Sequence, residues 1–290
     1  ALYTMTVGDF LGGGAKGWLF GAAKTEHSED QDVTLHEGKS DKKLRELKGG
    51  KAPVAGVVPV VGFSFDGKLI AMTGFEKKGP SLLIFDTATG RRVNILPINE
   101  NERNGAATAL AISADGRVLA AAYATKIEIV EIATARTLHT IAHAGRLTSL
   151  TFSPEGSFLV GLGENNDKYI WDASSGEKLA TLVNFSGAYG RGGDDWLVVA
   201  PDGLFDGSPA AWNQILWQFG GNTFDVNPAE TFFNDFYYPG LLAEIMAGKK
   251  PRAPRTVAQL DRRQPELELT TLSGQSGAGH IEERNLAVKI

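Results

Sequence analysis

The chain has 290 residues, with 29 basic and 34 acidic side chains, a net charge of -5 and no cysteine. A chain without cysteine cannot form disulfides, use a thiolate nucleophile or build a cysteine zinc site. Its acidic balance gives no electrostatic reason to expect nucleic acid. No apolar run approaches the roughly 20 residues of a spanning helix, so no membrane span is expected. These properties fit a cytoplasmic and an exported protein equally well, so the compartment stays open.

The first 50 residues predict one unit of short strands separated by polar or glycine-rich turns. Such a pattern is typical of an antiparallel meander. The strands are expected at residues 3–10, 17–23, 32–37 and 44–48. Residues 25–31 are a polar insertion within this unit. The chain starts at Ala1 without a methionine or a visible signal peptide, and we expect a processed chain or a fragment.

One sequence unit then recurs along the chain. Residues 63–71 (F-S-F-D-G-K-L-I-A) match residues 112–120 (I-S-A-D-G-R-V-L-A) and residues 152–160 (F-S-P-E-G-S-F-L-V). The Asp/Glu-Gly pairs begin at positions 66, 115, 155 and 202, so the steps are 49, 40 and 47 residues. This spacing suits a four-stranded blade of about 40–45 residues with loop insertions. Asp-Gly suits the tight turn between two strands because glycine tolerates a positive φ.

A second recurring feature is a strand that ends in an acidic residue and is followed by a turn of small residues. Residues 82–86, 127–131 and 169–172 are these strands, and a further short strand follows each of them. Because a single meander sheet cannot bury both of its faces, repeated four-stranded units predict an all-β fold of β-propeller blades. About five blades are recognisable, and the fifth is expected to begin at residues 196–199.

After residue 205 the pattern changes from strands to short helices. Ser208 and Pro209 are expected to be the N-cap and first position of a helix. Residues 215–219 are expected to close the fifth blade, and residues 227–237 and 241–247 to form two further helices. The densest group of aromatic residues lies here. We expect these aromatics to pack on the last blade, with a partner surface as the alternative. The candidate partner surface consists of Trp212, Trp217, Phe233, Tyr237 and Tyr238.

The sequence at the end of the chain predicts a linker followed by the start of another β unit. Residues 251–264 are basic and contain proline, and a solvated linker is expected there. Two strands, at residues 266–271 and 285–290, begin a further β unit. The expected segments are the blades at 1–205, a helical closing segment at 206–250, the linker at 251–264 and the β unit at 265–290.

The unit that starts at His143 resembles a WD40 repeat. The resemblance rests on His143, on the turn at residues 152–156 and on Tyr169-Ile170-Trp171-Asp172 at the end of a strand, and it implies a WD40-like β-propeller. In that family the histidine and a first-turn aspartate join a hydrogen-bond network with the tryptophan and a Ser or Thr. This chain keeps half of that pattern, since Trp-Asp occurs only once. The expected structural repeat positions are His143, Trp171, Asp172, Asp66, Gly67, Asp115, Gly116, Gly156, Asp202 and Gly203.

Residues 196–251 resemble the closing segment of bacterial WD40 proteins that are fused to a caspase-like peptidase domain. The stretches W-L-V-V-A-P-D-G-L-F-D-G-S-P-A-A-W and F-Y-Y-P-G-L-L-A-E-I-M-A-G-K-K-P carry this resemblance. It implies a propeller followed by a small β domain and then the peptidase. The catalytic cysteine of such a peptidase is not in this chain, so no catalytic residue carries over. Five blades are fewer than the usual seven, so a closed ring would need further blades or strands from another chain.

Polar groups elsewhere are expected to be structural. His143 precedes a strand, where a buried histidine generally finds a local hydrogen-bond partner, and the other histidines lack metal-ligand spacing. The Asp-Gly pairs lack the Asp-x-Asp-x-Asp-Gly series of a calcium loop. Asp194 and Asp195 are expected to be a solvated pair rather than an acid/base pair. We therefore expect no catalytic residue, no metal site and no cofactor.

A non-enzymatic protein-interaction scaffold or sensor is the expected function, because propellers bind partners through their loops. The family resemblance implies the regulatory propeller of a caspase-like peptidase system, with a protein as its partner. The alternatives are a propeller hydrolase with an active site at the channel mouth, and a self-assembling component whose open sheet edges pair between chains. The loops expected to contact a partner are residues 25–31, 75–80, 97–105 and 183–195.

Overall fold

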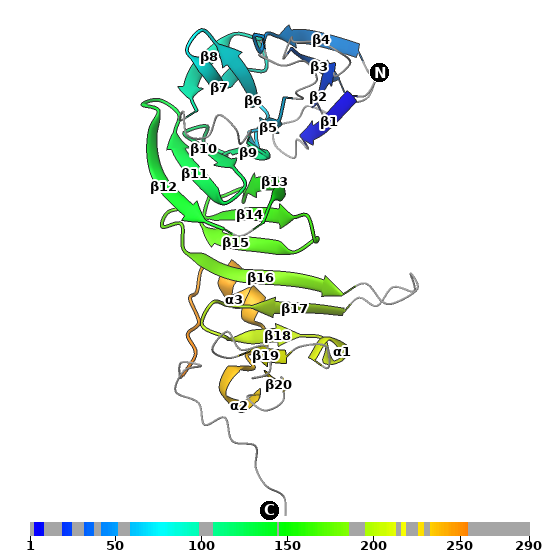
Figure 1. Cartoon of the computed structure of the whole chain (residues 1–290), viewed down its shortest axis with the longest axis vertical. Coiled ribbons are helices and arrows are strands. Elements are labelled where there is room, and N and C mark those ends of the chain that lie inside the picture. The colour runs from blue at the N-terminus through cyan, green and yellow to red at the C-terminus, as the bar shows by residue number, and fades with distance from the viewer. Residues whose placement is uncertain are drawn as a thin grey trace, which may run out of the picture.

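The fold is all-β, and four antiparallel sheets follow one another along the chain like the blades of a propeller (Figure 1). In Figure 1 these sheets are arranged around an arc, from the blue N-terminal sheet to the green fourth sheet. The computed structural model describes residues 3–8, 19–24, 32–37, 42–51, 59–98, 107–143, 145–185, 195–212, 216–218, 226–228 and 233–254.

The first three sheets each contain four strands in sequence order, as the repeat predicts. The first sheet consists of β1 (Tyr3–Gly8), β2 (Leu19–Lys24), β3 (Val33–Glu37) and β4 (Lys42–Leu47). The second sheet consists of β5 (Val61–Phe63), β6 (Leu69–Glu76), β7 (Gly79–Asp86) and β8 (Arg92–Pro97). The third sheet consists of β9 (Ala109–Ile112), β10 (Val118–Ala122), β11 (Lys126–Glu131) and β12 (Arg136–Ala142).

The fourth sheet has six strands, which corrects the prediction of a fifth blade at residues 196–199. Its strands are β13 (Leu147–Phe152), β14 (Phe158–Gly163), β15 (Lys168–Asp172), β16 (Lys178–Phe185), β17 (Asp195–Val199) and β18 (Phe205–Gly207). The register runs from Thr181↔Val199 to Phe185↔Asp195, so β17 extends the sheet instead of starting a new one. The physical reason is the length of β16, which spans eight residues and presents an open edge for β17 to pair with. The described residues therefore form four blades rather than five.

The Asp/Glu-Gly pairs form the first turn of the second, third and fourth sheets, as predicted, with φ angles of 68° at Gly67, 72° at Gly116 and 77° at Gly156. Gly203, with a φ of 99°, lies instead in the turn between β17 and β18 of the fourth sheet, so this pair does not begin a further blade. In the second sheet Asp66 Oδ1 accepts hydrogen bonds from Ser64 Oγ at 2.8 Å and from the backbone N–H of Lys68 at 3.1 Å. Ser113 Oγ donates to Asp115 Oδ1 at 2.6 Å in the same way. Both aspartates are thus engaged in closing their own turns.

The first strands of neighbouring sheets contact one another along the inside of the arc. β9 lies between β5 and β13, and Gly62 of β5 faces the Leu110 carbonyl so closely that an added Cβ would lie 2.3 Å from its oxygen. Apolar cores fill the space between successive sheets. The most deeply buried members include Leu35 and Met72 between the first two sheets, Ile84 and Leu119 between the next two, and Ile127 and Trp171 between the last two. Full burial of one such side chain contributes about 1.5–3 kcal/mol.

The helical segment covers both faces of the outer part of the fourth sheet. The three described helices are α1 (Pro209–Trp212), α2 (Phe233–Phe236) and α3 (Leu241–Met246). Leu241 and Ile245 of α3 belong to the same core as Phe158 and Ile170 of the sheet. On the other face Ala211 and Phe236 pack with Leu197 and Phe205. α3 therefore covers the side of the sheet on which a further blade would pack.

Three predictions for this region and for one loop are wrong. β19 (Leu216–Gln218) pairs with β20 (Val226–Pro228) instead of closing a blade. A helix was expected from residue 227, but Pro228 ends this short strand, where its missing N–H costs little. Residues 75–80 are not a long loop, because β6 and β7 pair up to Glu76↔Gly79 and join in a two-residue turn. The predicted strands at 266–271 and 285–290 and the loop 25–31 lie outside the described residues. The predicted loops 97–105 and 183–195 are described only at their ends, where residue 97 belongs to β8, residues 183–185 belong to β16 and residue 195 belongs to β17.

Candidate functional site

His143 and Trp171 lie together on the fourth sheet, as the resemblance implies, but the expected hydrogen-bond network is incomplete. The centroids of the two rings are 6.2 Å apart in an edge-to-face arrangement, and Tyr169 stacks on Trp171 at 5.8 Å. His143 Nε2 is buried and has no partner among the described residues. On β14, Leu159 is opposite Trp171, and the indole ring lies against Gly161, where an added Cβ would be 2.9 Å from it. Without a hydroxyl at that position, the cluster is held by ring packing.

Burial lowers the pKa of the His143 imidazole, with the charge of Lys178 acting in the same direction against a backbone hydrogen bond at Gly145. A lowered histidine pKa means that the folded protein binds this proton less readily than the unfolded chain. Its contribution to stability is therefore complete above the ordinary histidine value of about 6.5 and is lost as the pH falls through the folded pKa.

Replacing His143 with phenylalanine is expected to change the free energy of unfolding at pH 7 by less than about 0.5 kcal/mol, because an apolar ring of similar shape removes an unsatisfied nitrogen. Below pH 6 the His143→Phe protein is expected to be more stable than the original. Urea unfolding across pH 5 to 8 measures both effects. A loss of about 2 kcal/mol at pH 7 would show that the hydrogen bonds of the imidazole, including the one at Gly145, hold the fold more strongly than ring packing does.

Asp172 closes the turn after β15 and at the same time holds a segment from the end of the described chain. Its Oδ1 accepts hydrogen bonds from Ser174 Oγ at 2.6 Å and from the backbone N–H groups of Ser174 and Ser175 at 2.9 and 3.0 Å. Its other oxygen lies 3.0 Å from Lys250 Nζ. We call residues 249–254, which follow α3, the C-terminal strap.

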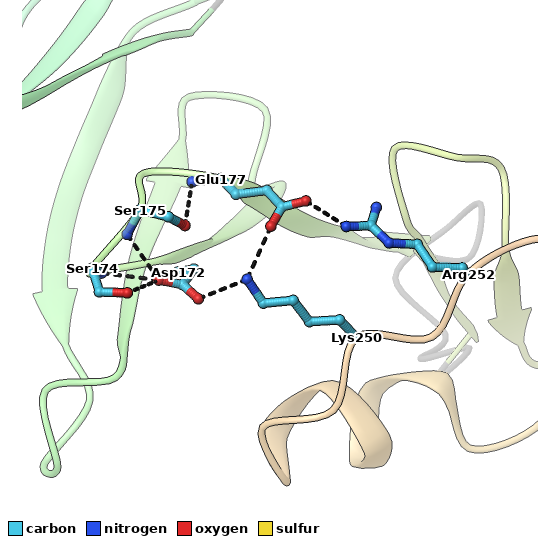
Figure 2. A network of polar contacts seen from close by, with 6 residues as sticks. All are labelled: Asp172, Ser174, Ser175, Glu177, Lys250 and Arg252. Carbon is cyan, nitrogen blue, oxygen red and sulfur yellow. Dashed lines mark hydrogen bonds and ion pairs between the residues drawn. The ribbon is translucent and has the colours of Figure 1, made fainter.

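Two cations of the C-terminal strap converge on two carboxylates of the fourth sheet (Figure 2). Lys250 Nζ lies 2.9 Å from Glu177 Oε2, and Arg252 Nη2 lies 2.8 Å from Glu177 Oε1. Figure 2 shows Lys250 reaching between Asp172 and Glu177, with Arg252 on the outer side of Glu177. A solvated linker was expected at residues 251–264, but Arg252, the basic residue of that range that the structure describes, is bound to the fourth sheet.

Two aspartates of the motif P-D-G-L-F-D-G accept hydrogen bonds from backbone N–H groups on either side of α3. Asp202 Oδ2 accepts a hydrogen bond from the N–H of Ala253 at 2.8 Å. Asp206, which is buried, accepts one from the N–H of Gly240 at 2.7 Å, directly before α3. The predicted repeat position Asp202 thus takes part in fastening the strap, and Asp206 fixes the start of α3.

The ion pairs of the strap shift the pKa values of Asp172, Glu177 and Lys250 toward the charged forms. The Ser174 hydroxyl, together with Lys250, holds the pKa of Asp172 well below its usual range. Lys250 and then Arg252 lower the pKa of Glu177, and Glu177 and then Asp172 raise the pKa of Lys250. Carboxyl groups with lowered pKa values stabilise the fold above their ordinary range near pH 4, and the effect is lost as the pH falls through the folded values.

Replacing Glu177 with glutamine is expected to raise the rate of trypsin cleavage between Arg252 and Ala253 several-fold, because Arg252 loses its ion pair and the strap opens more often. The control is Glu164→Gln, which removes an exposed ion pair with Arg146 away from the strap. In the unmodified protein the Ala253 amide NMR signal is expected to move toward its unfolded position as the pH falls below about 4. Equal cleavage of the two variants would show that the ion pairs do not hold the strap.

The aromatic residues that formed the candidate partner surface pack largely on one another. Phe233 lies 4.8 Å from Trp212 and 4.3 Å from Tyr237 between ring centroids, and Phe205 is in contact with Phe233 and Tyr237. Tyr238 packs at the margin of the core under α3, and the side chain of Trp217 lies outside the described part. Trp212 Nε1 is buried without a partner in the described structure. Whether the outer edges of these rings bind a partner stays a prediction.

The polar residues on the fourth sheet are arranged to hold turns and the C-terminal strap in place and not to catalyse a reaction. Each carboxylate accepts hydrogen bonds from a turn or from the strap. Across the described ranges, no three His, Asp or Glu side chains come close enough together to hold a metal ion. No helix in this part of the chain is both long and apolar enough to cross a membrane.

Sequence reasoning missed Glu177, Asp206, Lys250 and Arg252. The signal was partly visible, since the basic run at 249–255 and the acidic residues near 172–177 are complementary in charge. Lys250 and Glu177 are 73 residues apart, however, and charge alone does not select one acidic turn among several. The fold of α3 onto the fourth sheet is what brings them together.

No protein-family model matches the chain, and no curated protein matches it either. Among solved structures, the chain is similar to hydrazine synthase from Kuenenia stuttgartiensis, with a TM-score of 0.43 and 13% sequence identity. The alignment covers 66% of this chain, which spans 62% of that chain's length. A likeness at this level carries no argument about function.

Proposed function

We propose that this chain is a non-enzymatic protein-interaction scaffold, and that it is the WD40-like regulatory propeller of a bacterial caspase-like peptidase system. The observation that carries the proposal is the fastening of the C-terminal strap by Asp172, Glu177 and Asp202. Because the strap is bound to the fourth sheet, whatever follows it leaves the propeller-like array at a defined position. A change in the array can thereby act on a neighbouring domain.

The engagement of the recurring aspartates supports a scaffold over a propeller hydrolase. General acid/base catalysis needs carboxyl groups that reach a substrate within a pocket. Asp66, Asp115 and Asp172 instead each accept hydrogen bonds from the hydroxyl of a nearby serine in their own turn. Such residues hold loops in place, and the loops are then available to bind a partner.

The reading frame that encodes this chain provides the first test. The proposal expects the frame to continue past Ile290 into a region with a paired catalytic Cys and His. It also expects the purified chain to capture that region, or a substrate of it, in a pull-down. A stop codon directly after Ile290 would overturn the fusion, and failure to capture either protein would overturn the scaffold.

A further inference from the structure

We call the contact between two successive sheets a joint. At each of the first two joints, one side chain on the fourth strand of a sheet forms a hydrogen bond to the next sheet. This side chain directly follows the register shift in its strand. In the first sheet this residue is Arg45, which donates to the carbonyl of Thr87 at 3.1 Å and to that of Ala88. In the second sheet it is Asn94, which donates to the carbonyl of Ile132. Each of these carbonyls belongs to the turn after the third strand of the next sheet. The first two joints are therefore closed by a hydrogen bond.

The joint between the third and fourth sheets lacks this bond. His139 follows the register shift in β12, and the turn it faces contains Ala173, the counterpart of Thr87 and Ile132. No hydrogen bond joins His139 to that turn in the described structure. One of the two linking interactions seen at the earlier joints is therefore missing here.

A smaller side chain opens the same joint further. Leu69 begins β6 and reaches Gly116 of the next sheet, where an added Cβ would lie 3.1 Å from its Cδ1. The counterpart of Leu69 in the third sheet is Val118, because the backbone N–H of each residue donates a hydrogen bond to the serine hydroxyl of its own turn. Val118 is shorter, and Gly156, the counterpart of Gly116, has no atom within 4 Å of an added Cβ.

The result is a pocket of about 370 Å³ between the third and fourth sheets. Its floor is apolar and includes Val118, Ile129, Leu138 and Phe152. Asp115 and Glu155 line it on the side of the two first turns. This combination of an apolar floor and an acidic rim lies at the end of the sheets that carries the Asp-Gly turns.

The two carboxylates of the rim leave room for an incoming cation. Asp115 uses Oδ1 for Ser113 Oγ and for the N–H of Arg117, while Oδ2 is 3.8 Å from the exposed Arg117 Nε. Glu155 has no ion pair within the described part of the chain. Bonds from Ser113 and Arg117 lower the pKa of Asp115, so this carboxylate is charged at neutral pH. Arg117 is the charged group next to these carboxylates that would oppose a cation.

We propose that this pocket binds the side chain of an arginine or lysine in an exposed segment of a partner protein. The aliphatic stem of such a side chain packs on the apolar floor, and its cationic head pairs with Asp115 and Glu155. Within the chain, Lys250 shows the same pairing of a cation with two carboxylates, at 3.0 Å from Asp172 and 2.9 Å from Glu177. The inference names the partner chemistry of the scaffold and so rests on the proposed function.

The test uses a blocked pentapeptide, acetyl-Gly-Gly-Arg-Gly-Gly-amide, and its citrulline analogue, which has the same shape without the charge. Saturation-transfer and amide-shift NMR of the full chain measure binding. The arginine peptide is expected to shift amides around Asp115 and Glu155, and the citrulline peptide to bind at least about fivefold more weakly. Val118→Leu, which fills the space as Leu69 does in the preceding joint, is expected to abolish the shifts.

Glu155→Gln is expected to weaken binding of the arginine peptide about threefold, while the remote Glu164→Gln leaves it unchanged. Amide spectra of each variant establish that it is folded. Equal binding of the two peptides, or undiminished binding by Val118→Leu, would overturn the pocket. If the Val118→Leu protein no longer binds the peptide but still captures the peptidase region, the peptidase region binds at another surface. The proposed scaffold function would then still hold.

Discussion

Replacing Gly62 with alanine is expected to lower the free energy of unfolding by about 3 kcal/mol. The added Cβ would lie 2.3 Å from the Leu110 carbonyl oxygen and 2.7 Å from its carbon. Both atoms belong to the backbone of the neighbouring sheet and cannot rotate away, so the two sheets must separate. Urea unfolding followed by circular dichroism measures the loss.

Gly156→Ala is the matched control for this substitution. Gly156 has a φ of 77° and open space around an added Cβ, so alanine there costs only the strain of a left-handed backbone, about 1 kcal/mol. The difference between the two variants isolates the contact between the first strands. Equal losses would mean that β5 and β9 do not approach one another as closely as the fold requires.

Replacing Trp171 with alanine is expected to cost about 3–5 kcal/mol, because it leaves a large cavity in the core between the third and fourth sheets. The indole is 1% exposed and packs on Leu147, Leu159 and Ile127. Trp171→Phe retains an aromatic ring and is expected to lose less than half as much. Thermal and urea unfolding of both variants give the comparison.

A small loss on Trp171→Ala, below about 1 kcal/mol, would contradict the packing of the fourth sheet against the third. The two sheets would then unfold separately, and two transitions would replace one in the unfolding curve. A single transition with a large loss is the result that the described core predicts.

The repeat and its turns could be predicted from the sequence because they depend on local chemistry. Asp66-Gly67 and Asp115-Gly116 mark positions where glycine adopts the backbone without strain, and they lie at the same place in the second and third sheets. The alternation of apolar residues between such turns then determines the strands. The strand order of the first three sheets follows directly, since consecutive strands pair through short turns.

The placement of β17 and of the C-terminal strap could not be predicted in the same way. Trp196 to Val199 have the same apolar character whether they extend the fourth sheet or begin a fifth, so the pattern does not choose between the two. Lys250 and Arg252 find their carboxylates only after α3 has docked on the sheet. The pocket beside His139 arises because Val118 and His139 differ from Leu69 and Asn94, their counterparts in the second sheet. The effect of these differences depends on how the sheets pack on one another.

The proposed function is tested most directly by measuring the peptidase activity that we propose for the full-length protein. Cleavage of a fluorogenic peptide would be compared for the complete protein, for Glu177→Gln, which loosens the strap, and for Glu164→Gln as the control. Regulation through the strap predicts that Glu177→Gln changes the rate at least about threefold while Glu164→Gln matches the original. The same rate for all three proteins, and for the peptidase region without this chain, would contradict a regulatory role.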